Sequence, residues 1–369
     1  MSDPTSAYFG IRNDLADRLL KASHQLAGVP EGDRGAVLAA ALDAVPEADV
    51  LLRPHTSLFA DGGSASSRLA FSCLSAAATF PAARRDQIAD LGALTAVLFG
   101  MDDIADSIAG DWSDGDVAAF FGRIRAVLAA TGAEATPEAA SEAASDARAA
   151  SDAGAQAEAA PDAAMEAALG AWRAWCERFR AHPGAAAHTP SLLEQLRLAG
   201  TAMALERRWA IGGEPWPGYD RYVANGGLTI LYRTWWAAAL GVCGPEPADP
   251  GHWAAIERAT ALGAECMRLA NDLRTFERER REGKPNSVLI LERAGTGIEA
   301  AVERVSAHIA ELNAAFAAAL AELPPELAGV AEGQRRSVAF NGAWYMARDT
   351  HAYTVRDLAV DVETHNGGR

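Results

Sequence analysis

Apolar positions recur every three or four residues over most of the chain, whereas short alternating runs of Val, Ile and Thr are scarce. This period is that of an amphipathic helix rather than of a strand. Trp172, Trp175 and Phe179 illustrate it, because their spacing puts them on one helix face, where we expect a buried stripe. The commonest residues include Ala, Leu, Glu and Arg, which favour helices. The pattern predicts an all-α protein.

Gly and Pro residues interrupt the periodic segments and mark the ends of the expected helices. We expect helices over about 81–110, 191–211, 219–240, 252–282, 298–323 and 335–360, and helical periodicity resumes near Met165. Residues from about 131 to 162 are nearly all Ala, Glu, Asp, Ser and Gly, so they lack large side chains for packing. We therefore expect a single domain over 1–369 that carries a flexible insertion at about 131–162.

The composition excludes several classes of partner. The chain has 33 basic and 49 acidic residues and a formal charge of −16, so it has no basic footprint for nucleic acid. It also lacks an uncharged run of about 18 apolar residues, so we expect no stable membrane insertion. The four cysteines are scattered without metal-binding or redox spacing, which favours free thiols and a cytoplasmic location.

The run MDDIADS places Asp102, Asp103 and Asp106 near the end of a strongly apolar helix. Asp102 and Asp106 lie four residues apart and therefore share a helix face. Negative side chains near a helix C-terminus oppose the helix dipole and repel one another, a cost that a divalent cation would offset. A solvated acidic helix end is an equally good interpretation of this motif when it is taken alone.

The run NDLRTFERE places Asn271, Thr275 and Glu279 at intervals of four. On a helix these side chains stay within about 80° of one another along about 12 Å. An amide, a hydroxyl and a carboxylate form a hard oxygen ligand set that suits Mg²⁺. The alternative is an exposed polar helix face, but the charged residues that follow, up to Lys284, already supply such a face.

Together, DDIAD and NDLRTFERE resemble the aspartate-rich motif and the NSE motif of class I terpene synthases, and the resemblance covers about residues 53–357. It implies one α-helical bundle with a central active-site cavity and a prenyl diphosphate substrate. It also implies a carbon–oxygen lyase that uses Mg²⁺, with three ions expected and Mn²⁺ as the alternative metal. The implied metal ligands are Asp102, Asp106, Asn271, Thr275 and Glu279, and Asp103 joins them as a catalytic carboxylate.

Other segments resemble the substrate-binding parts of that family. In PWPGYDRYVANGG, Asn225 lies where many bacterial members carry an Arg, and Gly226 and Gly227 would permit a helix break. In WYMARDTHAYT, Ala352 stands where an Arg is expected before Tyr; Arg348 and Arg356 lie one helical turn on either side of it, and Arg348 is the first candidate to supply the guanidinium. For the aromatic candidates, ordinary core packing is the alternative. The predicted substrate-binding residues are Asn225, Arg278, Arg348, Tyr353, Phe99 and Trp344.

The form YVANGGLTI is similar to the YxxN stretch of kaurene-synthase-like diterpene cyclases, which implies a C20 substrate, either geranylgeranyl diphosphate or a bicyclic diterpenyl diphosphate. A sesquiterpene synthase that uses farnesyl diphosphate is one alternative. A chain-elongating prenyltransferase or a catalytically inactive helical relative is another. No DxDD run is present, so proton-initiated cyclisation is not expected. The resemblance is also compatible with a homodimer.

Overall fold

The computed structural model describes residues 26, 29–58, 62–105, 112–130, 163–347 and 353–367. Asp106, Arg348 and the expected insertion at about 131–162 lie outside these residues. Every regular element of the described part is a helix, as predicted. In chain order they are η1 (Glu31–Asp33), α2 (Arg34–Leu52), η2 (Arg53–Leu58), α3 (Gly62–Thr79), α4 (Arg85–Ala105), α5 (Asp114–Ala129), α7 (Ala163–Arg180), α8 (Ala185–Ala210), α9 (Tyr219–Thr229), α10 (Tyr232–Cys243), α11 (Gly251–Glu282), α12 (Ser287–Arg293), α13 (Ile298–Ala321), η3 (Pro325–Leu327), α14 (Ala328–Ala347) and α15 (Val355–Gly367).

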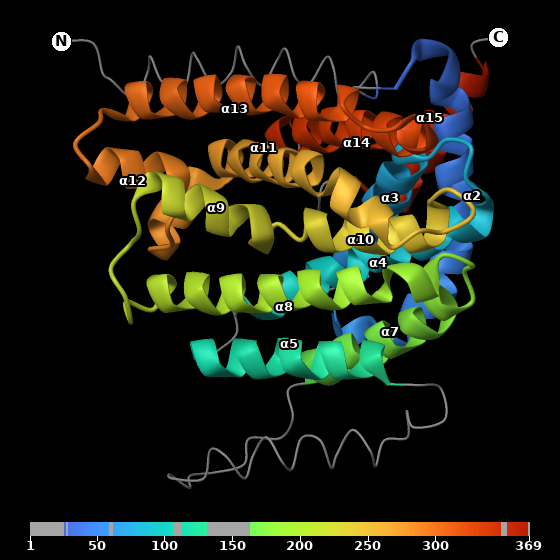
Figure 1. Cartoon of the computed structure of the whole chain (residues 1–369), viewed down its shortest axis with the longest axis horizontal. Coiled ribbons are helices and arrows are strands. Elements are labelled where there is room, and N and C mark those ends of the chain that lie inside the picture. Colours follow the sequence, from blue (N-terminus) through green and yellow to red (C-terminus); the bar gives the residue numbers. More distant parts are fainter. Residues whose placement is uncertain are drawn as a thin grey trace, which may run out of the picture.

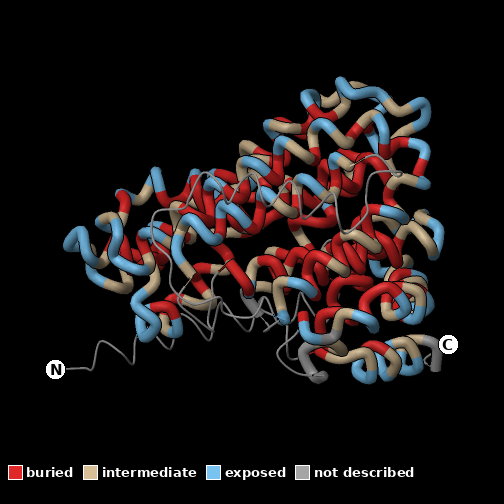
Figure 2. The backbone as a smooth tube through the Cα atoms, turned by 90° about the horizontal axis from the view of Figure 1, so that it is seen from below, coloured by how far each residue is buried: buried red, intermediate tan, exposed pale blue. Residues whose placement is uncertain are grey.

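Helix α11 lies in the interior of the bundle, because it packs against α9, α10, α12, α13 and α14. In Figure 1 the long helices follow one another from α13 at the top through α11, α9 and α10, and α8 to α5 at the bottom. Helices α2, α3 and α7 lie at the right of the picture. Helix α3 packs on α2, α4 and α14. Figure 2 shows buried positions along the facing sides of these helices and exposed positions at their ends and outer sides.

The predicted aromatic stripe on α7 is part of the core. Trp172, Trp175 and Phe179 are fully buried, and their rings stack in sequence with both centroid separations at 4.9 Å. Each indole N–H keeps a partner: Trp172 donates to the carbonyl of Ile124 at 2.8 Å and Trp175 to that of Asp90 at 2.9 Å. The stripe therefore holds α7 against α5 and α4 without leaving a buried donor unpaired.

The break inside the expected helix 219–240 occurs later than predicted. The sequence places it at Gly226 and Gly227, but both residues lie within α9, and the chain leaves the helix at Ile230 and Leu231. Leu231 has φ of +57°, a left-handed conformation that costs a residue with a side chain about 1–2 kcal/mol. The two glycines serve packing instead, because a Cβ at Gly226 would lie 2.6 Å from Cγ of Arg268 on α11.

Two other helix predictions need correction. Helix α3 was not predicted, and it is a core helix in which residues 67–79 are all buried. The expected helix over 335–360 is present as two helices, α14 and α15, of which α15 begins at Val355. Within the described residues, none of the helices combines the length and the apolar character that crossing a membrane requires.

The close approach of α9 to α11 leads to the first prediction. We expect Gly226→Ala to lower the free energy of unfolding by about 1–3 kcal/mol, because the new methyl group overpacks the interface with Arg268. The Arg268 side chain cannot turn away without losing its hydrogen bonds to Thr229 and Glu206. Urea unfolding measures the change.

Gly122→Ala is the matched control for Gly226→Ala. Gly122 lies in the middle of α5, is exposed, and would bring its Cβ within 4 Å of no other described atom. This substitution should stabilise the protein slightly, by up to about 1 kcal/mol, because Ala is the better helix former. Equal effects of the two substitutions would contradict the packing argument.

Candidate active site

A largely apolar cavity lies between α3, α4, α10, α11 and α14, and the α9–α10 break contributes to its wall. The space open to the centre of a water-sized sphere is about 80 Å³, several times what one water molecule needs. Among the described lining residues, Asp102 alone carries a formal charge. The lining consists of Phe71, Ser75, Thr95, Leu98, Phe99, Asp102, Thr229, Ile230, Leu231, Tyr232, Trp235, Met267, Ser337, Asn341 and Tyr345.

The first acidic motif lies at the C-terminal end of α4, with Asp102 on the cavity wall. Asp103 is 46% exposed and pairs with the buried Arg68 of α3, whose Nη2 lies 3.0 and 3.3 Å from its two carboxylate oxygens. The same guanidinium lies over the Phe99 ring, 4.3 Å from its centre. Arg68 thus offsets part of the repulsion between the motif carboxylates, a task that the sequence analysis assigned to a metal alone.

The second motif lies on α11, one helical turn after the cavity-lining Met267. Thr275 donates its hydroxyl proton to the backbone carbonyl of Asn271 at 2.9 Å, which leaves the lone pairs of its Oγ1 directed outward. Glu279 is 9% exposed, and its carboxylate is oriented by Asn286, whose Nδ2 donates to Oε2 at 2.7 Å. Asp102 of α4 and Met267 of α11 therefore line the same cavity from two helices, whereas Asn271, Thr275 and Glu279 are not among its described lining residues.

Burial, and after it the nearby charge of Asp272, raise the pKa of Glu279 to about 7. The guanidinium of Arg268, the hydrogen bond from Asn286 and the neighbouring Thr275 hydroxyl oppose this shift. A bound cation would favour the ionised form of Glu279, because it would offset the repulsion from the neighbouring carboxylate. The buried carboxylates of this site therefore outnumber its positive charges.

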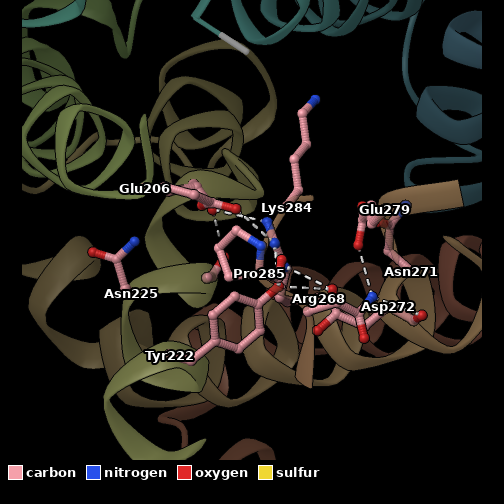
Figure 3. Close-up of polar contacts among 12 residues, drawn as sticks. Glu206, Tyr222, Asn225, Arg268, Asn271, Asp272, Glu279, Lys284 and Pro285 are labelled. Carbon is pink, nitrogen blue, oxygen red and sulfur yellow. Dashed lines mark hydrogen bonds and ion pairs between the residues drawn. The ribbon is translucent and has the colours of Figure 1, made fainter. Parts of the chain in front are cut away.

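Arg268 is the centre of the polar network beside the motif. Its Nη2 donates to Glu206 of α8 at 2.7 Å, its Nη1 to Thr229 of α9 at 3.1 Å, and its Nε to Asp272 of α11 at 3.0 Å. It also donates to the Tyr222 hydroxyl and lies over that ring. In Figure 3 the side chains of Glu206, Tyr222 and Asp272 surround that of Arg268. One buried cation thus joins three helices.

The loop after α11 completes the network. Asn286 donates to the backbone carbonyl of Asp272 at 3.0 Å as well as to Glu279, and its own Oδ1 caps α12 by accepting from the Val288 N–H. The second oxygen of Asp272 accepts from the Ser287 N–H at 3.0 Å. Asp272 is fully buried, so its role is to hold the motif helix and not to reach a ligand.

The residues present fit a divalent cation with oxygen ligands. The Asn271 amide, the Thr275 hydroxyl and the Glu279 carboxylate lie on one helix face. Thr275 is held by the bond that its hydroxyl donates to the Asn271 carbonyl, and Glu279 by the bond that it accepts from Asn286. No group of three or more His, Cys, Asp or Glu side chains within the described part of the chain could hold a metal by itself. This agrees with a mixed ligand set that is completed by a second helix and a substrate.

The structure brings only some of the predicted substrate-binding residues to the cavity. Phe99 lines it. Asn225 is not among the lining residues and donates to the Ala202 carbonyl of α8 at 3.1 Å, and in Figure 3 its side chain lies apart from the group around Arg268. The hydroxyl of Tyr353 donates to Asp361 at 2.5 Å.

Two further candidates also lie apart from the cavity lining. Trp344 is 2% exposed and packs between Phe71, Phe340 and Tyr353. The Arg278 side chain is 56% exposed and pairs with Glu282 at 3.7 Å. The substrate-binding roles of both residues remain predictions.

The sequence analysis missed Arg68, Arg268 and Asn286. Arg268 stands one turn before Asn271 on an otherwise apolar stretch, and a charge in such a place was a signal that could have been used. Asn286 follows Pro285 just beyond α11, as an N-cap residue would. Nothing in the local sequence around Arg68 indicates that it faces Asp103, because the two belong to different helices.

Solved structures with a similar fold include two terpene synthases and a protein from ancestral sequence reconstruction. The 2-methylisoborneol synthase from Streptomyces coelicolor A3(2), in complex with Mg²⁺ and 2-fluoroneryl diphosphate, is 18% identical with a TM-score of 0.64, covering 82% of this chain and 90% of that one. The linalool/nerolidol synthase from Streptomyces clavuligerus, in complex with 2-fluorogeranyl diphosphate, is 17% identical with a TM-score of 0.59, covering 83% and 97%. The SVS_A2 protein from ancestral sequence reconstruction is 18% identical with a TM-score of 0.62, covering 83% and 84%.

The chain thus has the all-α fold of class I terpene synthases. Residues 93–314, more than half of the chain, match the family described as terpene synthase family 2, C-terminal metal binding, and the chain belongs to this family. The matched range contains the motif residues Asp102 and Asn271 and the network residue Arg268. No curated protein matches the chain at a significant level.

The buried network makes a prediction for stability. Arg268→Met should lower the free energy of unfolding by about 3–5 kcal/mol, because it leaves the Glu206 and Asp272 carboxylates without their buried partner. Arg278→Met on the same helix is the control, since it removes an exposed pair that contributes at most about 1 kcal/mol. Urea unfolding of both variants tests the difference, and a small effect of Arg268→Met would refute the central role of this guanidinium.

The raised pKa of Glu279 makes a prediction for pH dependence in metal-free protein. Its pKa in the folded state, about 7, lies above the value near 4.5 of an ordinary Glu. The neutral carboxyl therefore stabilises the fold below about pH 4.5, and this contribution is lost as the pH rises through about 7. In EDTA, the Tm of wild type should fall by roughly a few degrees more than that of Glu279→Gln as the pH rises from about 4.5 to about 7. Parallel Tm profiles of the two proteins would contradict the shift.

Proposed function

We propose that the protein is a magnesium-dependent class I terpene synthase that ionises a prenyl diphosphate and releases diphosphate and a terpene hydrocarbon or alcohol. The observation that carries this proposal is that Asp102 and the Asn271 motif helix flank one apolar cavity. A metal-binding entrance suits the diphosphate, and an apolar interior suits the prenyl chain. The family membership supports the same reaction class.

The metal would be held by Asp102, Asn271, Thr275 and Glu279, with Asp106 as a further ligand from the segment outside the described residues. Bound Mg²⁺ would supply charge neutralisation of the diphosphate leaving group, with three ions expected and Mn²⁺ as the alternative. Mg²⁺ accompanies a substrate analogue in the Streptomyces coelicolor structure, which supports the choice of metal. The roles of the protein residues are to position these ligands and to keep water away.

The cavity wall offers weak donors to a carbocation. The faces of aromatic rings attract cations, and Phe71, Phe99 and Trp235 line the cavity. Helix α9 ends at the wall, where Thr229, Ile230 and Leu231 are exposed to the cavity. The C-terminal end of a helix carries partial negative charge on its unpaired carbonyl groups. The break between α9 and α10 therefore brings the carbonyl end of α9 to the cavity wall.

We propose a C20 substrate, either geranylgeranyl diphosphate or a bicyclic diterpenyl diphosphate, with farnesyl diphosphate as the alternative. The YVANGGLTI segment supports the C20 choice through its likeness to diterpene cyclases. Two neighbouring structures contain 2-fluoroneryl and 2-fluorogeranyl diphosphate, which supports an allylic diphosphate as the reactive group but does not set the chain length here.

Incubation with geranyl, farnesyl, geranylgeranyl and copalyl diphosphates, followed by gas chromatography–mass spectrometry and diphosphate release, tests the proposal. We expect a Mg²⁺-dependent terpene from a C20 substrate and a loss of at least about 100-fold in Asp102→Ala and Asn271→Ala, since each removes a stabilising contact to the leaving group. Glu303→Ala, an exposed carboxylate on α13, is the control and should retain full activity.

The other outcomes have distinct meanings. A product from farnesyl diphosphate alone would replace the C20 assignment with the sesquiterpene alternative. Longer prenyl diphosphates formed on addition of isopentenyl diphosphate would identify a chain-elongating enzyme. Folded protein that binds Mg²⁺ but releases no diphosphate from any of the four substrates would overturn the proposal in favour of an inactive relative.

A further inference from the structure

A cluster of polar side chains interrupts the apolar cavity wall. Ser75 of α3 and Ser337 and Asn341 of α14 line the cavity, and all three are at most 6% exposed. Ser75 donates to Asn341 Oδ1 at 2.8 Å, and Asn341 Nδ2 donates to Ser337 Oγ at 3.1 Å. Tyr232 of α10 lines the same wall and is 4% exposed. Buried polar groups are costly, so a group of four beside an apolar cavity calls for a ligand.

The cluster lies at the end of the cavity remote from the metal motifs. On α3, Ser75 follows Arg68, the partner of Asp103, by seven residues, which corresponds to about 10 Å of helix. On α14, Asn341 precedes Tyr345 by one turn, and Tyr345 lies close enough to Arg68 and Asp102 for both charges to act on its pKa. Along both α3 and α14, the residues therefore change from charged or near-charged positions at the cavity entrance to polar positions in its interior.

The cluster has hydrogen-bonding capacity that the protein does not use. The Asn341 amide has two N–H groups and two acceptor lone pairs, and its bonds to Ser75 and Ser337 use one of each. The Tyr232 hydroxyl and the indole N–H of Trp236 are buried and have no direct hydrogen-bond partner among the described residues. Ser337 and Trp236 nevertheless lie near enough to that hydroxyl to lower its pKa against the effect of burial. One water molecule could join these groups, since a buried water typically makes about three hydrogen bonds.

We propose that Ser75, Ser337, Asn341 and Tyr232 hold a water molecule that attacks the carbocation, so that the product is an alcohol whose oxygen is not on the carbon that carried the diphosphate. This inference rests on the proposed function and specifies its product. The oxygen is expected on a carbon other than C1, because C1 stays near the metal end of the cavity and the cluster lies at the opposite end.

The step balances without a further reactant. A lone pair of the water oxygen forms a C–O bond to the cationic carbon, and the resulting oxonium loses a proton by breaking one O–H bond. The proton goes to the diphosphate released in the same turnover, which is the strongest base that the reaction supplies. The sum is prenyl diphosphate plus water giving alcohol plus hydrogen diphosphate.

The reaction could instead terminate when the cation loses a proton to the protein, but the cluster contains no suitable base. The cluster consists of hydroxyl groups and one amide, and Asp102 at the opposite end is the one carboxylate of the described lining. Burial raises the pKa of Tyr232, so its phenol stays protonated and acts as a donor to water. The cluster is therefore suited to hold a neutral nucleophile and not to remove a proton.

Turnover of the Mg²⁺-loaded full-length protein in H₂¹⁸O tests the inference, with the prenyl diphosphate that gave product in the assay above. We expect an alcohol with one ¹⁸O atom on a carbon other than C1, located by mass fragmentation and NMR. The ratio of alcohol to hydrocarbon among the products should fall about 10-fold or more in Asn341→Leu and Ser75→Ala. Tyr232→Phe, which keeps the ring, should lower the ratio in the same direction.

Ser72→Ala is the matched control, because Ser72 is a buried serine on the same helix that does not line the cavity. It should leave the product ratio unchanged. A wild-type hydrocarbon product formed with equivalent diphosphate release would overturn the inference and leave the proposed function intact. An unchanged ratio in Ser75→Ala and Tyr232→Phe, or ¹⁸O only at C1 as in plain hydrolysis, would also overturn it. Absence of Mg²⁺-dependent diphosphate release would remove the proposed function and the inference with it.

Discussion

The buried ion pairs of Arg268 are the interaction on which the site depends. This one guanidinium forms ion pairs with Glu206 on α8 and Asp272 on α11 and also bonds to Thr229 on α9. Burying a charged side chain costs several kcal/mol, so the three helices are held in the one arrangement that keeps these charges paired. Glu279 is a further buried carboxylate nearby, and burial together with the charge of Asp272 raises its pKa. The same network that fixes the helices therefore leaves negative charge where a cation would bind.

The packing of Arg268 explains the form of α9. Gly226 leaves room for the aliphatic part of the Arg268 side chain, so α9 can approach α11 closely and continue past both glycines. The chain then leaves the helix at Ile230 and Leu231, beside the cavity, and α10 restarts at Tyr232. A break at the glycines would have directed the end of α9 elsewhere. The conformational cost of Leu231 is met by tertiary packing, because its side chain is 5% exposed.

The parts of the site that the sequence predicted are those that depend on a single helix. The spacing of Asn271, Thr275 and Glu279 fixes their common face whatever surrounds them, and the long helix α11 agrees closely with the predicted 252–282. Contacts between helices could not be read in the same way. Arg68 and Asp103 are 35 residues apart on different helices, so no pattern within a single helix connects them.

The helical geometry also orders the chemistry along the cavity. Helices α3, α4 and α14 run along it, so each turn moves about 5 Å away from the acidic entrance. On α4 the lining changes from Asp102 through Phe99 to Thr95, and on α3 from Phe71 to Ser75. A charged end, an aromatic middle and a polar interior therefore follow from residue spacing alone. A substrate anchored by its diphosphate would meet these environments in the order in which a cation is formed, stabilised and captured, because its chain extends in the same direction as the helices.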